Sequence, residues 1–309
     1  MLRQPSVMQY SWPARYAPPI PVWRSTALLI IHSQYGYRDP WWGNSSNPDY
    51  ERNISSLLAK FRSYSETTPE DELPLIIHVQ LKPMAFDSPL YPGKVGPYGV
   101  NGEEKNGMDF LECSVPLVQR PDGSNEPAAS SEPAASSEPG DPSVLSSNEI
   151  VITSRSYNAF NNTSLESLLK ERNIRTLLVA GITTDHAVST TVRAAYDLAI
   201  NGKWGGPGYI AETSRYLSTD GAGLWGHKRH VYGNPEVTQE DLLDWAVDMA
   251  RILVISDSTR CFSREGEMDV EMVHRANVQS LSPFADVTRT DVVLRQLYQD
   301  KRWKTWTLS

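Results

Sequence analysis

A short polar segment, Thr183–His186, is the part of the chain best suited to chemistry, because it joins a buried strand to a helix. Residues 177–180 before it are all apolar, which is typical of a strand buried on both faces. After it, apolar side chains recur at three- and four-residue spacing from Val188 to Ala199, as in an amphipathic helix. The first turn of such a helix presents unpaired backbone N–H groups that can stabilise an oxyanion. We call residues 182–187 the elbow, and expect the oxyanion site at Ile182, Thr183, Thr184 and Ala187.

Two other strands should end beside the elbow, because open parallel sheets bind ligands at the carboxyl ends of their strands. His32 follows the apolar strand 26–31, and Ser154 and Arg155 follow the strand 149–153. A histidine ordinarily titrates near neutrality and can move a proton. We therefore expect His32, Ser154 and Arg155 to be the catalytic side chains. The alternative for His32 is a core histidine whose ring is bonded to a carbonyl.

Two motifs resemble the isochorismatase-like cysteine hydrolases. Residues 181–188, Gly-Ile-Thr-Thr-Asp-His-Ala-Val, are similar to that family's Gly-Val-x-Thr-Asp-x-Cys-Val. Upstream, residues 157–160 with Thr163 and Leu165 resemble its Tyr-Ser-Ala-Phe-x-x-Thr-x-Leu motif. The resemblance covers residues 26–200 and 251–298, and implies an α/β fold. Its mostly parallel central sheet would carry helices on both faces, as a Rossmann-like three-layer sandwich.

The residues that do the family's chemistry differ in this chain. The family uses a cysteine thiolate as nucleophile, an aspartate as base and a lysine nearby. Carried over by motif, the cysteine falls on Ala187, the aspartate on His32 and the lysine on Ser154, or on Arg155 if the register shifts by one. An alanine at the nucleophile position alone would also fit an engineered replacement. Three altered positions together favour native loss of thiol hydrolysis.

The resemblance also suggests which residues line a substrate pocket. An aromatic loop follows the first strand, where the family lines its site, and the Tyr-Asn-Ala-Phe motif follows the third. Ordinary packing of a surface loop is the alternative for the four aromatic residues nearest His32. The predicted substrate-binding residues are Gln34, Tyr35, Tyr37, Trp41, Trp42, Tyr157 and Phe160.

Composition excludes several function classes. The chain has 309 residues, a hydrophobic fraction of 39% and a formal net charge of −8, with no basic cluster. An acidic balance argues against nucleic acid and anionic membranes as partners, and no apolar run is long enough to span a bilayer. Two cysteines and no apolar signal segment indicate a cytoplasmic protein with free thiols. We expect a small-molecule substrate, and, by analogy to the family, a homo-oligomer or a hetero-oligomer with a paralogue.

The chain divides into one isochorismatase-like domain, residues 26–298, with additions. Residues 1–25 are rich in proline and predict an extended N-terminal arm, and residues 299–309 form a C-terminal tail. Residues 121–147 contain a Glu-Pro-Ala-Ala-Ser-Ser repeat and predict a disordered insertion; residues 201–240 form a second insertion. Strands are expected at 26–31, 75–79, 149–153, 177–181, 251–256 and 284–287, and helices at 48–64 (capped by Asn47), 163–173, 188–200, 239–250, 267–281 and 289–298.

The other histidines are not expected to form a metal site. His78 lies mid-strand among apolar residues and should be structural, and His186 should point away from the crevice. His227 and His230 have a spacing that suits a metal on a helix, but the flanking glycines and basic residues favour a solvated loop. We predict no metal and no cofactor.

Three functions remain open. The favoured one is a repurposed enzyme that performs non-hydrolytic acid–base chemistry, such as cyclisation, isomerisation or elimination, on a small carbonyl- or enol-bearing metabolite. The second is a catalytically dead pseudoenzyme that binds an active paralogue. The third is a residual hydrolase that uses an activated water. An accessible crevice faced by His32 would support the first, and a crevice plugged by Trp41, Trp42 or residues 201–240 would support the second.

Overall fold

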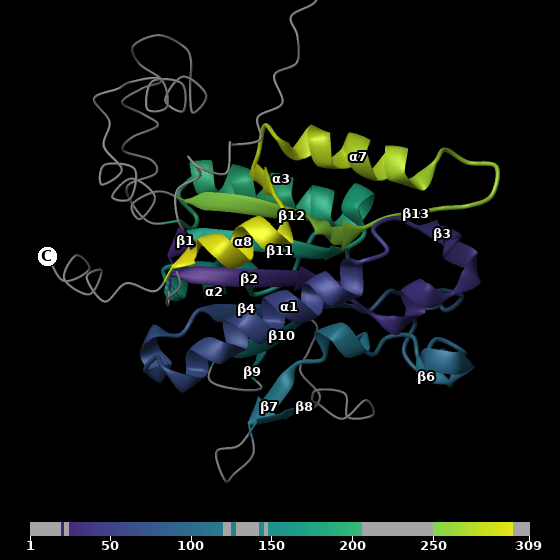
Figure 1. The fold of residues 1–309 in the computed structure, drawn as a ribbon, viewed down its shortest axis with the longest axis horizontal. Helices are drawn as coiled ribbons and strands as arrows, with labels where there is room; N and C mark the ends of the chain where they lie inside the picture. The colour runs from purple at the N-terminus through teal and green to yellow at the C-terminus, as the bar shows by residue number, and fades with distance from the viewer. Residues whose placement is uncertain are drawn as a thin grey trace, which may run out of the picture.

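The computed structural model describes residues 20–21, 25–119, 125–127, 142–144, 148–205 and 250–298. Within them, seven strands form the main sheet in the order β14-β12-β11-β2-β4-β10-β9 (Figure 1). Every neighbouring pair is parallel except β9 with β10. The predicted mostly parallel α/β sheet is therefore confirmed. Its strands are β2 (Thr26–Ile31), β4 (Leu75–Leu81), β9 (Pro142–Val144), β10 (Glu149–Ser154), β11 (Thr176–Ile182), β12 (Arg251–Arg260) and β14 (Asp286–Thr288).

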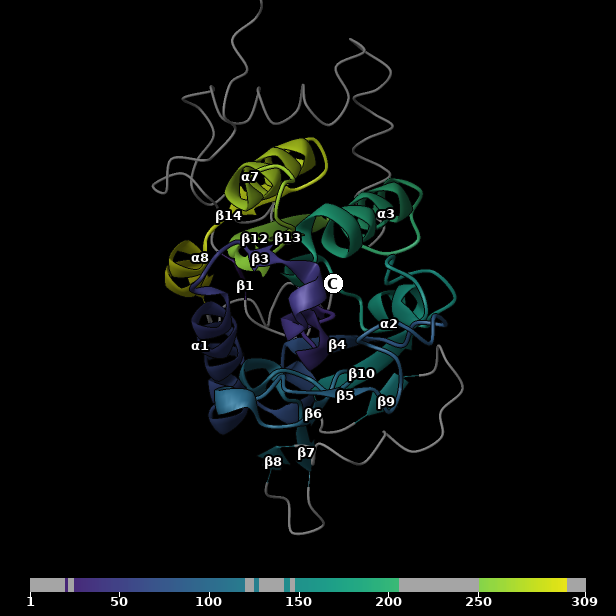
Figure 2. The same ribbon diagram turned by 90° about the vertical axis from the view of Figure 1, so that its right-hand side faces the viewer.

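Two helix layers cover the sheet, as Figure 2 shows edge-on. Alternate residues of a strand face opposite sides, so Leu28 and Ile30 pack with α1 (Tyr50–Ser63) and α8 (Thr290–Gln296). Leu29 and Ile31 pack instead with α2 (Leu165–Glu171), α3 (Ser189–Ile200) and α7 (Val270–Leu281). The apolar runs of the sequence thus become central strands buried on both faces. Short two-stranded pairs lie outside the sheet: β1 (Ile20–Pro21) with β15 (Leu297–Tyr298), β3 (Asn44–Ser45) with β13 (Phe262–Ser263), β5 (Val95–Gly96) with β6 (Lys105–Asn106) and β7 (Leu117–Gln119) with β8 (Asn125–Pro127).

The predicted cap of α1 is wrong. The helix begins at Tyr50 with Asp49 as its N-cap residue. Asn47 instead adopts a positive φ of 48°, and its side-chain amide donates to the carbonyl oxygens of Ser256 and Thr259 at 2.9 and 2.5 Å. A tertiary contact with β12 has taken the side chain that local sequence assigned to the helix.

The insertion at 121–147 is not disordered throughout. Its residues 125–127 form β8, which pairs antiparallel with β7, and residues 142–144 form β9 at the edge of the main sheet. Backbone hydrogen bonds make these pairings, so the absence of large apolar side chains does not prevent them. The following lie outside the described residues: the remainder of the insertion, residues 206–240 with His227 and His230, and the tail. The helix expected at 239–250 also lies outside them except for Ala250, which is described and is not helical.

The first described residues of the N-terminal arm are anchored. Ile20 is fully buried in the core on the α1 side, and β1 pairs in parallel with β15, which follows α8. Residues 1–19 and 22–24 lie outside the described part. Among the described helices, none combines the length and apolar character needed to cross a membrane.

Candidate active site at the carboxyl edge of the sheet

The strands that carry the predicted site residues are adjacent. Gly181 of β11 pairs with Ile31 of β2, and the backbone N–H of His32 donates to the Val79 carbonyl of β4 at 2.8 Å. Ser154 of β10 pairs with Leu81 of β4. His32, Ser154 and the elbow therefore leave the sheet at the same edge, as the sequence predicted. Gly181 is required where β11 meets β2, because a side chain there would collide with the Ile31 carbonyl and its φ is 127°.

The elbow forms an unusual helical turn. Residues Thr184–Val188 wind as a π-helix that continues into α3, and such turns occur frequently at functional sites. The Val188 N–H donates to the Thr183 carbonyl at 2.9 Å, which closes the turn. The Ala187 methyl is fully buried in the core between the sheet and α3. Ala187, which the motif resemblance predicts to occupy the position of the family's nucleophile, thus lies in the elbow with a methyl group that cannot attack a carbonyl.

His32 is the most unusual side chain of this edge. Its backbone φ is 49°, a left-handed conformation that is uncommon for a residue other than glycine. The side chain is fully buried, and among the described residues neither Nδ1 nor Nε2 has a hydrogen-bond partner. Burial lowers the pKa of His32 to about 3, so the imidazole is neutral at pH 7. The expectation of titration near neutrality is therefore wrong, and the carbonyl-bonded core histidine finds no support among the described contacts.

Ser154 and Arg155 differ from His32 in their surroundings. The Ser154 hydroxyl donates to the Ser156 carbonyl at 2.9 Å and accepts from the Ser156 N–H at 3.1 Å. It therefore closes a local turn after β10. Arg155 is exposed. Catalytic roles for these two residues stay predictions.

The aromatic loop packs as a cluster on β13. The Tyr37 ring stacks on Phe262 at a centroid distance of 5.7 Å and lies 4.8 Å from Trp42. Trp42 donates from its indole nitrogen to the Gly36 carbonyl at 2.9 Å, while Trp41, 54% exposed, meets it edge-on at 4.7 Å. Of this cluster, only Tyr37 buries a polar atom without a described partner: its hydroxyl. The Tyr37 hydroxyl is thus the clearest candidate for a ligand contact in the loop.

Other predicted pocket residues have structural partners. The Gln34 amide nitrogen donates to the carbonyls of Leu81 and Met108 at 3.0 and 2.8 Å, and its oxygen accepts from the Leu81 N–H at 2.7 Å. These bonds hold the start of the loop against β4. The Tyr35 phenol is bonded to Glu112, and Phe160 packs against the core on the α3 side.

Asp185 is a site residue that the sequence interpretation missed, although it lies within the elbow motif. Its Oδ2 is 3.0 Å from His186 Nδ1, whereas its buried Oδ1 has no partner among the described residues. His186 is 61% exposed at its side chain and stacks on Tyr157 at 5.6 Å. Burial would raise the pKa of Asp185, but hydrogen bonds from His186 and neighbouring groups outweigh it and lower that pKa. Asp185 is therefore an ionised acceptor at neutral pH.

The comparisons with known proteins agree with this geometry. The family model described as the isochorismatase domain matches residues 26–201, more than half of the chain. The chain belongs to the isochorismatase family. It is 25% identical over 175 residues to the uncharacterized isochorismatase family protein YrdC of Bacillus subtilis (strain 168). The matched region covers 57% of this chain and 68% of that protein.

Solved structures of the same family share the fold. A structure from Chromobacterium violaceum ATCC 12472 superimposes with a TM-score of 0.55 at 19% identity, covering 91% of this chain and 97% of that one. A second, from Burkholderia xenovorans LB400, gives a TM-score of 0.50 at 15% identity and covers 92% of each chain. At this level of identity the likeness shows the fold alone.

The cysteines of this isochorismatase-family chain do not supply a thiolate at neutral pH. Both cysteines of the sequence lie in the described part and are free. Burial raises the pKa of Cys113 to about 12 and that of Cys261 to about 11. Both thiols are protonated at neutral pH and therefore weakly nucleophilic.

A second histidine, also missed at the sequence level, contacts the elbow from helix α7. His274 of α7 is buried, with Nδ1 3.0 Å from the Thr184 hydroxyl and Nε2 3.1 Å from the Asn47 amide nitrogen. It thus links the elbow, the loop before α1 and helix α7. No sequence motif connects these three segments, so only the fold reveals the link.

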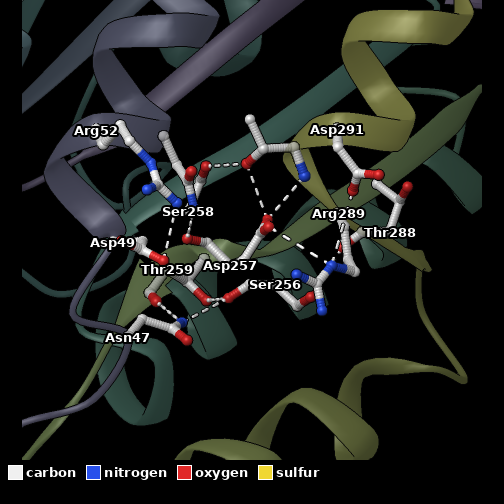
Figure 3. Close-up of polar contacts among 12 residues, drawn as sticks. Asn47, Asp49, Arg52, Ser256, Asp257, Ser258, Thr259, Thr288, Arg289 and Asp291 are labelled. Carbon is white, nitrogen blue, oxygen red and sulfur yellow. Dashed lines mark hydrogen bonds and ion pairs between the residues drawn. The ribbon is translucent and has the colours of Figure 1, made fainter.

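A separate polar cluster surrounds Asp257 on β12 (Figure 3). Its Oδ1 accepts from the N–H and hydroxyl of Thr290 at 2.7 and 2.8 Å, and its carbonyl accepts from the Asn53 amide at 2.7 Å. These bonds join β12 to the start of α8 and to α1. We interpret the cluster as a structural joint. The described residues also contain no group of three His, Cys, Asp or Glu side chains arranged to hold a metal ion.

Proposed function

We propose that this isochorismatase-family protein catalyses proton transfer on a small carbonyl- or enol-bearing molecule, without a covalent thiol intermediate. Isomerisation, cyclisation and elimination belong to this class. The observation that carries the proposal is the buried imidazole of His32, whose two ring nitrogens both lack described partners. A buried polar atom without a partner destabilises a protein by about 1–3 kcal/mol, so such atoms are rare and are usually completed by a ligand, an ion or an ordered water.

A neutral imidazole can transfer a proton without becoming charged. One ring nitrogen accepts a proton from a carbon or hydroxyl of the substrate, while the N–H of the other donates its proton to the substrate's carbonyl oxygen. The substrate changes from keto to enol form, or the reverse, and the imidazole ends as its other tautomer, which proton exchange with water returns to the first before the next turnover. This exchange needs both ring nitrogens free, and it suits a ring whose pKa, about 3, disfavours the imidazolium.

The elbow would contribute through its backbone. N–H groups in the first turn leading to α3 can stabilise negative charge on the substrate oxygen. The buried Ala187 methyl leaves the adjacent space without a nucleophile. A carbonyl held there would be polarised without being attacked, which favours proton transfer over hydrolysis.

The proposal can be tested before the substrate is identified. We would incubate catalytic amounts of the protein with fractionated metabolite extracts in deuterated buffer, and follow products by mass spectrometry and NMR. Proton transfer predicts an isomer of the substrate, or a product lacking a leaving group, that is heavier only by the deuterium at the carbon that exchanged. Two products whose masses together equal the substrate plus one water would indicate hydrolysis. Absence of turnover together with a co-purifying paralogue would indicate the pseudoenzyme.

His32→Ala should lower turnover about 10²–10⁴-fold, the usual contribution of a general acid–base group. His32→Asp should not restore it, because a carboxylate of ordinary pKa is a poor proton donor near pH 7. Cys113→Ser and Cys261→Ser are the matched controls and should retain turnover, since neither thiol is ionised. Full activity of His32→Ala would contradict the proposal.

A further inference from the structure

Two further buried atoms at this edge lack described partners, and they are chemically complementary. They are the hydroxyl of Tyr37 and Oδ1 of Asp185. Tyr37 is 3% exposed and lies in the turn Tyr35–Arg38 after β2, whereas Asp185 lies in the elbow after the neighbouring strand β11. The same edge of the sheet therefore presents a phenol and a carboxylate oxygen whose hydrogen-bonding capacity is unused among the described residues.

Tyr37 and the elbow of Asp185 lie near the same short segment, residues 261–262. The Tyr37 ring stacks on Phe262, and Ile182, where the elbow of Asp185 begins, pairs with Arg260, the residue before this segment. Burial raises the pKa of the Tyr37 phenol, and the charge of Asp185 adds to this. Tyr37 thus remains a hydrogen-bond donor at neutral pH while Asp185 remains an acceptor.

The surrounding charges disfavour an anionic ligand. Of the two candidates for the family's lysine position, Ser154 is uncharged with its hydroxyl engaged in a turn, and Arg155 is exposed. Arg38, beside Tyr37 in the loop, forms ion pairs with Glu51 and Glu112 at 2.8 and 3.1 Å. Asp185 itself would repel a carboxylate, and His186 already neutralises part of its charge at 3.0 Å.

We propose that Tyr37 and Asp185 recognise an uncharged α-hydroxycarbonyl group, or its enediol, on the substrate. The Tyr37 hydroxyl donates to the carbonyl oxygen, and Asp185 Oδ1 accepts from the adjacent hydroxyl. A carboxylate would satisfy Tyr37 but offers no proton to Asp185. This inference rests on the proposed function only for the fate of the bound molecule, and its binding can be measured separately.

The test compares three matched probes by ligand-observed NMR and calorimetry. α-Hydroxyacetophenone carries the proposed group, acetophenone lacks the hydroxyl, and phenylglyoxylate carries a carboxylate instead. We expect α-hydroxyacetophenone to bind about tenfold more tightly than acetophenone, the effect of one hydrogen bond, and phenylglyoxylate to bind weakest. Equal binding of all three, or no binding of α-hydroxyacetophenone, would overturn the inference.

Variants separate recognition from stability. Tyr37→Phe removes an unpartnered hydroxyl, so it should weaken the binding of α-hydroxyacetophenone about tenfold without lowering the Tm. The matched control is Tyr98→Phe, because Tyr98 is buried to the same 3% but its hydroxyl donates to Asp39 at 2.8 Å. That control should lower the Tm and leave binding unchanged. Unchanged binding in Tyr37→Phe would overturn the assignment.

Asp185→Asn provides the sharper readout. The new amide can donate, and the negative charge is gone, so phenylglyoxylate should gain affinity while the preference for the hydroxyl disappears. If Asp185 had only a structural role, Asp185→Asn would weaken the binding of all three probes alike. If the probe order holds but His32→Ala keeps full turnover, recognition stands and the proposed proton transfer fails.

Discussion

Two buried polar groups lie at opposite ends of the central strands, and they differ in how far their atoms are satisfied. At the amino end of β10, Glu149 Oε1 lies 2.6 Å from Arg62 Nε, and Oε2 lies 3.1 Å from His78 Nε2 and 3.0 Å from the Leu117 N–H. At the carboxyl edge, His32, Tyr37 and Asp185 all bury polar atoms without described partners. The exception in the first group is His78 Nδ1, which also lacks one.

We interpret the contacts of Glu149 as stabilising the fold. We interpret the unpartnered atoms of His32, Tyr37 and Asp185 as available to a ligand. Burial would raise the pKa of Glu149, but bonds from His78 and Arg62 outweigh it and lower the pKa to about 2. Nothing comparable acts on His32, where burial alone lowers the pKa. The predicted structural role of His78 is therefore supported by its contact with Glu149, while particular atoms of His32, Tyr37 and Asp185 at the carboxyl edge have no partner among the described residues.

The largest expected effect comes from removing Glu149 from its hydrogen-bonded group. Glu149→Ala should lower the free energy of unfolding by about 3–5 kcal/mol, because it leaves Arg62 partly buried without its counter-ion. Urea denaturation measures this. The control is Glu103→Gln, which removes an exposed ion pair with Lys105 and should change stability by less than about 1 kcal/mol. Equal effects in the two variants would contradict the stabilising role of the Glu149 group.

A pH titration of stability sharpens the contrast. The unfolded chain protonates His32 below pH 6.5, whereas the native ring stays neutral down to about pH 3. Unfolding therefore becomes more favourable as the pH falls through this window, by about 2 kcal/mol between pH 6.5 and 5. His32→Gln should remove that part of the slope. Identical slopes in both proteins would show that His32 is not held neutral.

Glu149 should act with the same sign in a more acidic window. Its native pKa, about 2, lies below the ordinary value of 4.5, so its contribution is present above pH 4.5 and is lost as the pH falls toward 2. The Glu149→Gln variant should therefore lose less stability than the wild type below pH 4.5. The interval between pH 6.5 and 5 reports on His32 without this contribution.

The smallest expected effect concerns Ala187. Ala187→Cys alone should give a thiol that iodoacetamide labels slowly at pH 6 and no hydrolase activity, because the base and the cation are missing. Adding His32→Asp and Ser154→Lys should accelerate the labelling. Rapid labelling of the single variant would show that the elbow alone activates a thiol, and would favour an engineered alanine.

Much of the fold followed from local sequence because apolar runs formed the inner strands and the two motifs indicated the family, whereas the order of the strands comes from the structure. The extent of the low-complexity disorder did not, since β9 pairs with β10 through its backbone and its side chains carry no strand signal. Asn47 was misassigned because β12 competes for its amide. At the site, motif positions identified His32 and Ala187. The unpartnered polar atoms of Tyr37 and Asp185 depend on three-dimensional contacts that no local pattern encodes. The same holds for the contact of His274 with Thr184 of the elbow.

The pairing of β1 with β15 sets a condition on biosynthesis. Ile20 is matched in register with Leu297, so two segments on either side of the whole main sheet in sequence complete one small parallel pair. A chain emerging from the ribosome cannot form this contact until residues 297 and 298 have been made. Pairing of β1 therefore waits for the synthesis of β15, and a truncation before residue 297 would leave Ile20 without its partner.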